Sequence, residues 1–167
     1  MRSFGWRGTY VPLSFALRAG RELKDLTFAV SDLRSKSGTI NSGAIDLRVV
    51  APWFRPFGGK PRLINEMLLR DPEFAVPLPE QQKNQYKDPK YGNDAEKLLP
   101  LTIAAGTNRQ VYLTVRIPDK AAAGVYRGNI TGKSSDGRTV SFSIELEVLP
   151  FDLEPTPYAY SAYYRIY

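Results

Sequence analysis

Carboxyl groups are the side chains in this sequence best suited to acid–base chemistry. The chain has no histidine and no cysteine, which excludes Ser-His-Asp hydrolases, thiol nucleophiles and thiolate metal sites. Glycosidases work with two carboxylates, so this class stays open. Glu145 and Glu147 stand two residues apart in an alternating segment and therefore point to one face. That spacing does not distinguish an acid from a base, so we interpret both as solvated surface residues and expect no catalytic residue.

Oxygen-bearing side chains near residue 90 could bind a hard cation. Asp88, Asn93 and Asp94 offer carboxylate and amide oxygens of the kind that Ca²⁺ prefers. Their spacing does not match an EF-hand loop, and Asp and Asn are also common in turns. We therefore expect a polar turn here, with no metal ion and no cofactor.

Aromatic residues offer a different chemistry, because sugar rings stack on exposed aromatic faces. Trp53, Phe54, Tyr86 and Tyr91 are the candidate carbohydrate contacts. The alternative is structural: Trp53 continues an apolar strand into the core, and the tyrosines pin down a long loop. The sequence favours the structural interpretation and leaves the carbohydrate contact open.

Strands must position these residues, because the dominant hydrophobic period is two. Apolar residues alternate with polar or mixed ones over 11–17, 26–30, 45–49, 111–117 and 140–148. Glycine-containing turns separate the segments, and Asp136-Gly137 predicts a hairpin. One apolar face per strand is typical of an antiparallel sheet that buries one side. The pattern predicts an all-β fold, a two-sheet antiparallel Ig/fibronectin-like β-sandwich with a long loop insertion.

The middle of the chain interrupts this pattern. From residue 54 to residue 98 the sequence is rich in Pro, Gly, Lys, Asn and Gln and lacks a clear period. A stretch of that length without periodicity is usually functional or mobile. We therefore predict a β-sandwich domain over residues 1–153 with a loop inserted at about 54–98.

Residues 104–130 carry the strongest resemblance to known proteins. A polar-alternating strand ends at Pro118, and a short Ala-rich loop leads to Gly124-Val125-Tyr126-Arg127-Gly128 at the start of the next strand. Pro118 cannot donate to a strand ladder, Gly124 permits a tight reversal, and the Tyr126 hydroxyl can bond back as in a tyrosine corner. This segment resembles the Ig-like or fibronectin-like accessory domains of bacterial glycoside hydrolases.

The resemblance extends over most of the chain. Residues 8–18, 45–53 and 63–71 are similar to the N-terminal domain of glycoside hydrolase family 123 and its uncharacterised relatives. Residues 148–153 resemble the point where such proteins pass into their catalytic barrel. The resemblance implies that residues 154–167 are a linker or the first strand of a missing C-terminal barrel domain. The family's catalytic acidic pair lies in that barrel, so no catalytic residue is carried over to this chain.

The expected function follows from this resemblance. It implies a non-catalytic accessory or structural domain of a secreted bacterial glycoside hydrolase-like protein acting on polysaccharide, with the missing catalytic domain as partner. Tyr158, Tyr160, Tyr163 and Tyr164 are the candidate domain interface. Two alternatives stay open. One is a carbohydrate-binding module using the aromatics of residues 53–91, and the other is an adhesion or assembly module pairing through its C-terminal strand.

Charge and hydropathy limit the other partners. The net charge is +6 and the pI about 9.5, but Lys and Arg are scattered among acidic residues and no nucleic-acid-binding motif accompanies them. No apolar segment approaches the roughly 20 residues that span a bilayer. We therefore expect neither nucleic acid nor membrane as a partner. Residues 1–6 lack the apolar core of a signal peptide, so the expected extracellular or periplasmic location needs a signal not present in this chain.

Overall fold

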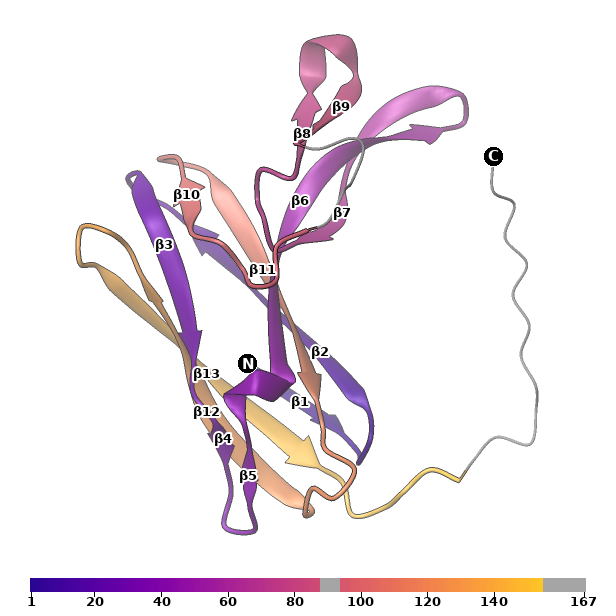
Figure 1. Ribbon diagram of the computed structural model, residues 1–167, viewed down its shortest axis with the longest axis vertical. Coiled ribbons are helices and arrows are strands. Elements are labelled where there is room, and N and C mark those ends of the chain that lie inside the picture. Colours follow the sequence, from indigo (N-terminus) through magenta and orange to yellow (C-terminus); the bar gives the residue numbers. More distant parts are fainter. Residues whose placement is uncertain (88–93, 155–167) are drawn as a thin grey trace.

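Two β-sheets pack face to face in the computed structural model, which describes residues 1–87 and 94–154 (Figure 1). The prediction of an all-β sandwich is confirmed. Helical structure in the described residues is confined to two 3₁₀ turns, Ser42–Ala44 and Pro79–Gln81. Within those residues, no helix has the length and apolar character needed to cross a membrane.

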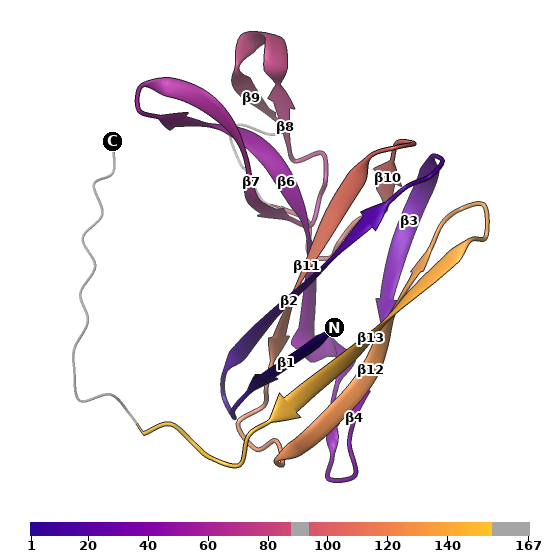
Figure 2. The same ribbon diagram turned by 180° about the vertical axis from the view of Figure 1, so that it is seen from behind.

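The first sheet contains the first and the last strand. Its order is β1 (Arg2–Gly5), β13 (Thr139–Val148), β12 (Gly124–Lys133), β3 (Leu23–Val30) and β10 (Leu101–Ile103), and the short strands β4 (Leu33–Arg34) and β5 (Thr39–Ile40) join it at β12. β1 runs parallel to β13, whereas the other pairs are antiparallel (Figure 2). The entry and exit of the sandwich therefore lie on one strand pair.

The second sheet is antiparallel throughout. Its order is β2 (Tyr10–Arg18), β11 (Asn108–Arg116), β6 (Ile45–Phe57) and β7 (Lys60–Leu69), and a separate hairpin follows from β8 (Ala75–Leu78) and β9 (Lys83–Tyr86). β11 pairs with β6 only as far as Val50. The outer half of β6 continues beyond β11 and pairs with β7.

Inward-facing residues of both sheets form one core. Val111, Leu113 and Val115 on β11 are completely buried, as the alternation predicts. Phe15 of β2 stacks on Phe142 of β13 with ring centroids 4.2 Å apart, which joins the two sheets directly. Each fully buried aliphatic or aromatic side chain contributes roughly 1.5–3 kcal/mol through the apolar surface removed from water.

The β11–β12 connection has the geometry that the sequence predicts. Gly124 has a φ of +143°, which L side chains rarely adopt. Tyr126 is 1% exposed, and its hydroxyl donates a 2.8 Å hydrogen bond to the carbonyl oxygen of Ala122. This bond holds the Ala-rich loop over the end of the sandwich, as a tyrosine corner does. The predicted hairpin is also confirmed: Gly137 has a φ of +84° and lies between β12 and β13.

The middle of the chain differs from the prediction. The loop predicted over 54–98 is wrong for much of its length, because β6 runs on to Phe57 and β7, β8 and β9 follow. The sequence did not indicate these strands because they contain prolines, and proline is rare inside a sheet. Pro52 and Pro56 alternate with Phe54 on the part of β6 that extends beyond β11, so their missing N–H groups face no ladder strand. The insertion is built from hairpins rather than from an irregular loop.

Candidate functional site

The outer half of the β6–β7 hairpin, residues 52–66, extends beyond the sandwich and is called the arm below (Figures 1 and 2). Gly58 and Gly59 close the arm with φ values of +58° and +80°. Two consecutive residues of positive φ make a two-residue turn whose twist matches that of the flanking strands. The turn fixes the register, which places Arg55 directly opposite Arg62. The arm therefore presents two defined faces.

Asn84 on β9 braces the arm. The backbone N–H of Phe54 donates to Asn84 Oδ1 at 2.7 Å, and Asn84 Nδ2 donates to the Phe54 carbonyl oxygen at 2.8 Å. The side-chain amide thus satisfies backbone groups on the edge of β6 that no strand covers. Tyr86, on the same strand as Asn84, places its ring edgewise against Phe74 with centroids 6.4 Å apart.

The oxygen donors considered for calcium are not assembled by the described residues. Asp94 accepts the backbone N–H groups of Arg70 and Asp71 on its two carboxylate oxygens, each at 2.8 Å. Asp88 and Asn93 lie outside the described residues. Across 1–87 and 94–154, no group of three or more His, Cys, Asp or Glu could hold a metal ion. Asp94 therefore acts as a backbone cap at the base of the insertion.

Asp71 is a second residue whose carboxylate holds neighbouring segments together at the base of the insertion. Its carboxylate accepts Lys87 Nζ at 2.7 Å and the Glu73 backbone N–H at 2.9 Å. Burial raises the pKa of Asp71, but these hydrogen bonds and the charge of Lys87 outweigh burial and hold the pKa below its usual value. The ionised carboxylate therefore joins the segment after β7 to the residue that follows β9.

Two of the residues predicted to contact carbohydrate, Trp53 and Phe54, do not share a face. Trp53 and Phe54 are neighbours on β6, so their side chains point to opposite faces of the arm. Both are half-buried and neither belongs to the core, so the interpretation of Trp53 as a core residue is wrong. Tyr86 is 37% exposed, and Tyr91 lies outside the described residues. Trp53 and Phe54 therefore cannot stack on the same sugar ring.

Glu66 orders the face of the arm that carries Trp53. Trp53 Nε1 donates to Glu66 Oε1 at 2.9 Å, and Arg55 Nη1 donates to the two Glu66 oxygens at 3.0 and 3.1 Å. The bond from Trp53, together with Arg55, holds the pKa of Glu66 below its usual value. The sequence interpretation missed Arg55 and Glu66 as partners. The available signal was Gly58-Gly59, a two-residue hairpin turn.

Glu145 and Glu147 lie on the outer face of the first sheet. Glu145 pairs with Arg2 at 2.7 Å and with Arg127 at 2.9 Å, and Glu147 is exposed. The contacts of Glu145 are those of a surface ion pair.

Apolar side chains are exposed where the chain leaves the sandwich. Trp6 stacks on Phe151 with centroids 5.8 Å apart, and Arg7 pairs with Asp152 at 3.1 Å. These contacts tie the segment after β13 to the segment after β1. Phe151 is 45% and Leu153 61% exposed, and together with Trp6 they are called the exit patch. The predicted interface residues lie outside the described part of the chain: Tyr158, Tyr160, Tyr163 and Tyr164.

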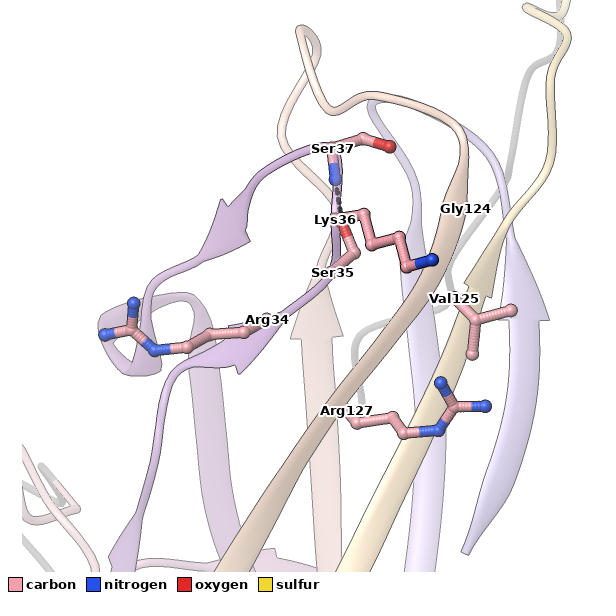
Figure 3. Close-up of a pocket in the computed structure, with 7 residues that line it drawn as sticks. All are labelled: Arg34, Ser35, Lys36, Ser37, Gly124, Val125 and Arg127. Carbon is pink, nitrogen blue, oxygen red and sulfur yellow. Dashed lines mark hydrogen bonds between the residues drawn. The ribbon is translucent and has the colours of Figure 1, made fainter.

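An open pocket of about 530 Å³ lies between the β4–β5 turn and the start of β12 (Figure 3). Arg34, Lys36 and Arg127 line it and would suit an anion. However, Arg34 pairs with Asp32 at 3.1 Å, and Arg127 pairs with Glu145. The side chains of Arg34 and Arg127 also point away from each other in Figure 3. Two of the three cationic side chains, Arg34 and Arg127, are therefore already paired with carboxylates.

A larger open groove of about 1370 Å³ runs beside β6, with Phe28 and Leu98 among its apolar walls. Within it, Asp46 accepts Arg48 Nε at 2.7 Å and Arg70 Nε at 2.9 Å. Burial raises the pKa of Asp46, but the hydrogen bonds and charges of the two guanidinium groups outweigh burial and lower the pKa. This bridge ties β6 to the residue that follows β7, so its polar groups serve the fold.

No protein-family model matches the chain, and no curated protein matches it in sequence. Among solved structures, a family 123 glycoside hydrolase from Clostridium perfringens matches with a TM-score of 0.63 and 15% sequence identity. What the two chains share is a fold. The match covers 90% of this chain and 23% of the hydrolase, so this chain spans about a quarter of that enzyme's length.

Two further structures match more distantly. The PapD-like domain 7 of human CEP192 has a TM-score of 0.39 at 7% identity, covering 90% of this chain and 82% of that one. AvmM, which catalyses macrocyclization in alchivemycin A biosynthesis, has a TM-score of 0.43 at 10% identity, covering 90% of this chain and 87% of that one.

Proposed function

We propose that this chain is a non-catalytic accessory domain of a secreted glycoside hydrolase-like protein that acts on polysaccharide. The observation that carries the proposal is the coverage of the match. Nearly all of this chain corresponds to under a quarter of a glycoside hydrolase. A sandwich that accompanies a separate catalytic domain accounts for that proportion. Similarity of fold supports a function by analogy, so the proposal needs a direct test.

The exit patch supports the same proposal. Phe151 and Leu153 expose large apolar surfaces beside the point where the chain continues past residue 154. Exposed apolar surface of this kind is typical of a contact with another domain. In the proposal, a following catalytic domain covers the exit patch, and the tyrosines of residues 158–164 add to the interface.

Two measurements on the purified chain test the proposal. The chain should not hydrolyse a panel of aryl glycosides. It should also migrate unretarded through gels that contain neutral polysaccharides. Turnover that disappears when an acidic residue is substituted would show that the chain is itself an enzyme. Salt-resistant retardation by a neutral glycan, abolished by Trp53→Ala or Tyr86→Ala, would instead establish a carbohydrate-binding module.

A further inference from the structure

One face of the arm carries a row of cations and aromatic rings. Alternation along β6 places Trp53, Arg55 and Phe57 on this face, and the register places Arg62 and Lys60 opposite the last two. We call Arg55, Phe57, Lys60 and Arg62 the basic stripe. The positions from Trp53 to Phe57 span about 14 Å at the rise of an extended strand, and the basic stripe occupies the outer half, about 7 Å. The stripe is an extended surface rather than an enclosed pocket.

The positive charges of the basic stripe lie close enough together to lower the stability of the fold. Arg55 and Arg62 occupy directly opposite positions, where like charges are destabilising. Glu66 neutralises Arg55 alone. Arg62 lies over the ring of Phe57, 4.8 Å from its centroid, and this cation–π contact leaves the guanidinium charge in place. Among residues 1–87 and 94–154, no carboxylate lies within ion-pair distance of Lys60 or Arg62.

The stripe is both exposed and held in place. Phe57 is 58% exposed, and Lys60 and Arg62 are exposed beside it. The two-residue turn sets the register, Asn84 braces the strand edge at Phe54, and Glu66 fixes Arg55. A surface ordered in advance loses less conformational entropy when it binds a partner. The unmatched charge on a braced arm therefore points to a negatively charged ligand.

We propose that the basic stripe binds an acidic polysaccharide, one that carries carboxylate or sulfate groups. Guanidinium groups pair with such oxyanions through paired N–H donors, and Lys60 adds a point charge. Phe57, which is 58% exposed, offers an apolar surface on which a sugar ring can lie. A linear polymer suits an extended stripe. The choice of a glycan over other polyanions rests on the proposed accessory function.

Affinity electrophoresis of the full chain tests this proposal. Gels contain polygalacturonate, heparin or neutral dextran, at low and at physiological salt. We expect retardation by at least one acidic glycan and none by dextran, with weaker retardation at higher salt. Lys60→Gln combined with Arg62→Gln removes two donors of charge-assisted hydrogen bonds and should weaken binding at least about tenfold. Phe57→Ala should weaken it as well.

The matched control is Arg34→Gln combined with Lys36→Gln, which removes the same charge from the pocket of Figure 3. Binding within about twofold of the wild type is expected for this control. Equal loss in both double variants would reduce the binding to net charge and overturn the proposal. So would the absence of retardation, or tighter binding of a single-stranded oligonucleotide than of either glycan. None of these results affects the accessory function, which is tested by the aryl glycosides and neutral gels.

Discussion

Tyr126→Phe gives a quantitative test of the sandwich, because it removes one oxygen atom from a side chain that is 1% exposed. The bond lost is the 2.8 Å hydrogen bond to the Ala122 carbonyl oxygen. A neutral hydrogen bond contributes about 0.5–1.5 kcal/mol, and a buried acceptor left without a partner costs more. Ala122 is exposed, so its carbonyl group can bind water instead. We therefore expect the free energy of unfolding to fall by about 1 kcal/mol.

Urea unfolding followed by tryptophan fluorescence measures this loss. The midpoint should fall while the slope of free energy against urea stays constant, because the surface exposed on unfolding is unchanged. The melting temperature should fall by about 2–4 °C. Tyr10→Phe is the matched control, since Tyr10 is 65% exposed and its change should stay within roughly 0.5 kcal/mol. A loss in Tyr126→Phe no larger than in the control would refute the stabilising role of the tyrosine corner.

The remaining predictions concern a glycine, an amide and a carboxylate. Gly128→Ala should cost about 1–3 kcal/mol in the urea assay, because its Cβ would lie 2.8 Å from a backbone carbonyl oxygen; Gly20→Ala, with open space around it, should cost much less. Asn84→Ala should speed hydrogen–deuterium exchange over residues 75–87, and unchanged exchange would contradict the bracing role. Asp46→Asn should lose roughly 1 kcal/mol near pH 7. Folding lowers the pKa of Asp46, so its contribution to stability is complete above about pH 4 and is lost as the carboxylate protonates at lower pH. The free energies of unfolding of the wild type and Asp46→Asn should therefore converge at low pH. A difference independent of pH would argue against the ion-pair bridge.

The strands of the sandwich could be predicted because each buries one face. Leu113 and Val115 alternate with exposed or half-buried residues, and a period of two states both the element and its inner side. The tyrosine corner was also predictable, because Gly124 and Tyr126 act within one short segment. In both cases the causes lie within about ten residues of each other along the chain.

The arm could not be predicted in the same way. Pro52 and Pro56 argue against a strand until it is known that this edge of β6 is open. Asn84 contacts Phe54 across 30 positions of sequence, and no local pattern marks that pair. The opposition of Arg55 and Arg62 depends on the register, which a one-residue change in the turn would alter. Contacts that depend on register or on long-range packing appear only in three dimensions.

The parallel pairing of β1 with β13 decides how the sandwich responds to tension. Arg2 lies opposite Glu145 and Gly5 opposite Val148, so a pull on residue 1 and on residue 154 would act along the two strands in opposite directions. The hydrogen bonds between them would then be strained together, in shear, instead of being peeled apart one at a time. Forced unfolding is governed by the rate of crossing such a barrier. A pull applied to the outer ends of β1 and β13 would therefore meet this barrier before the core of the sandwich opens.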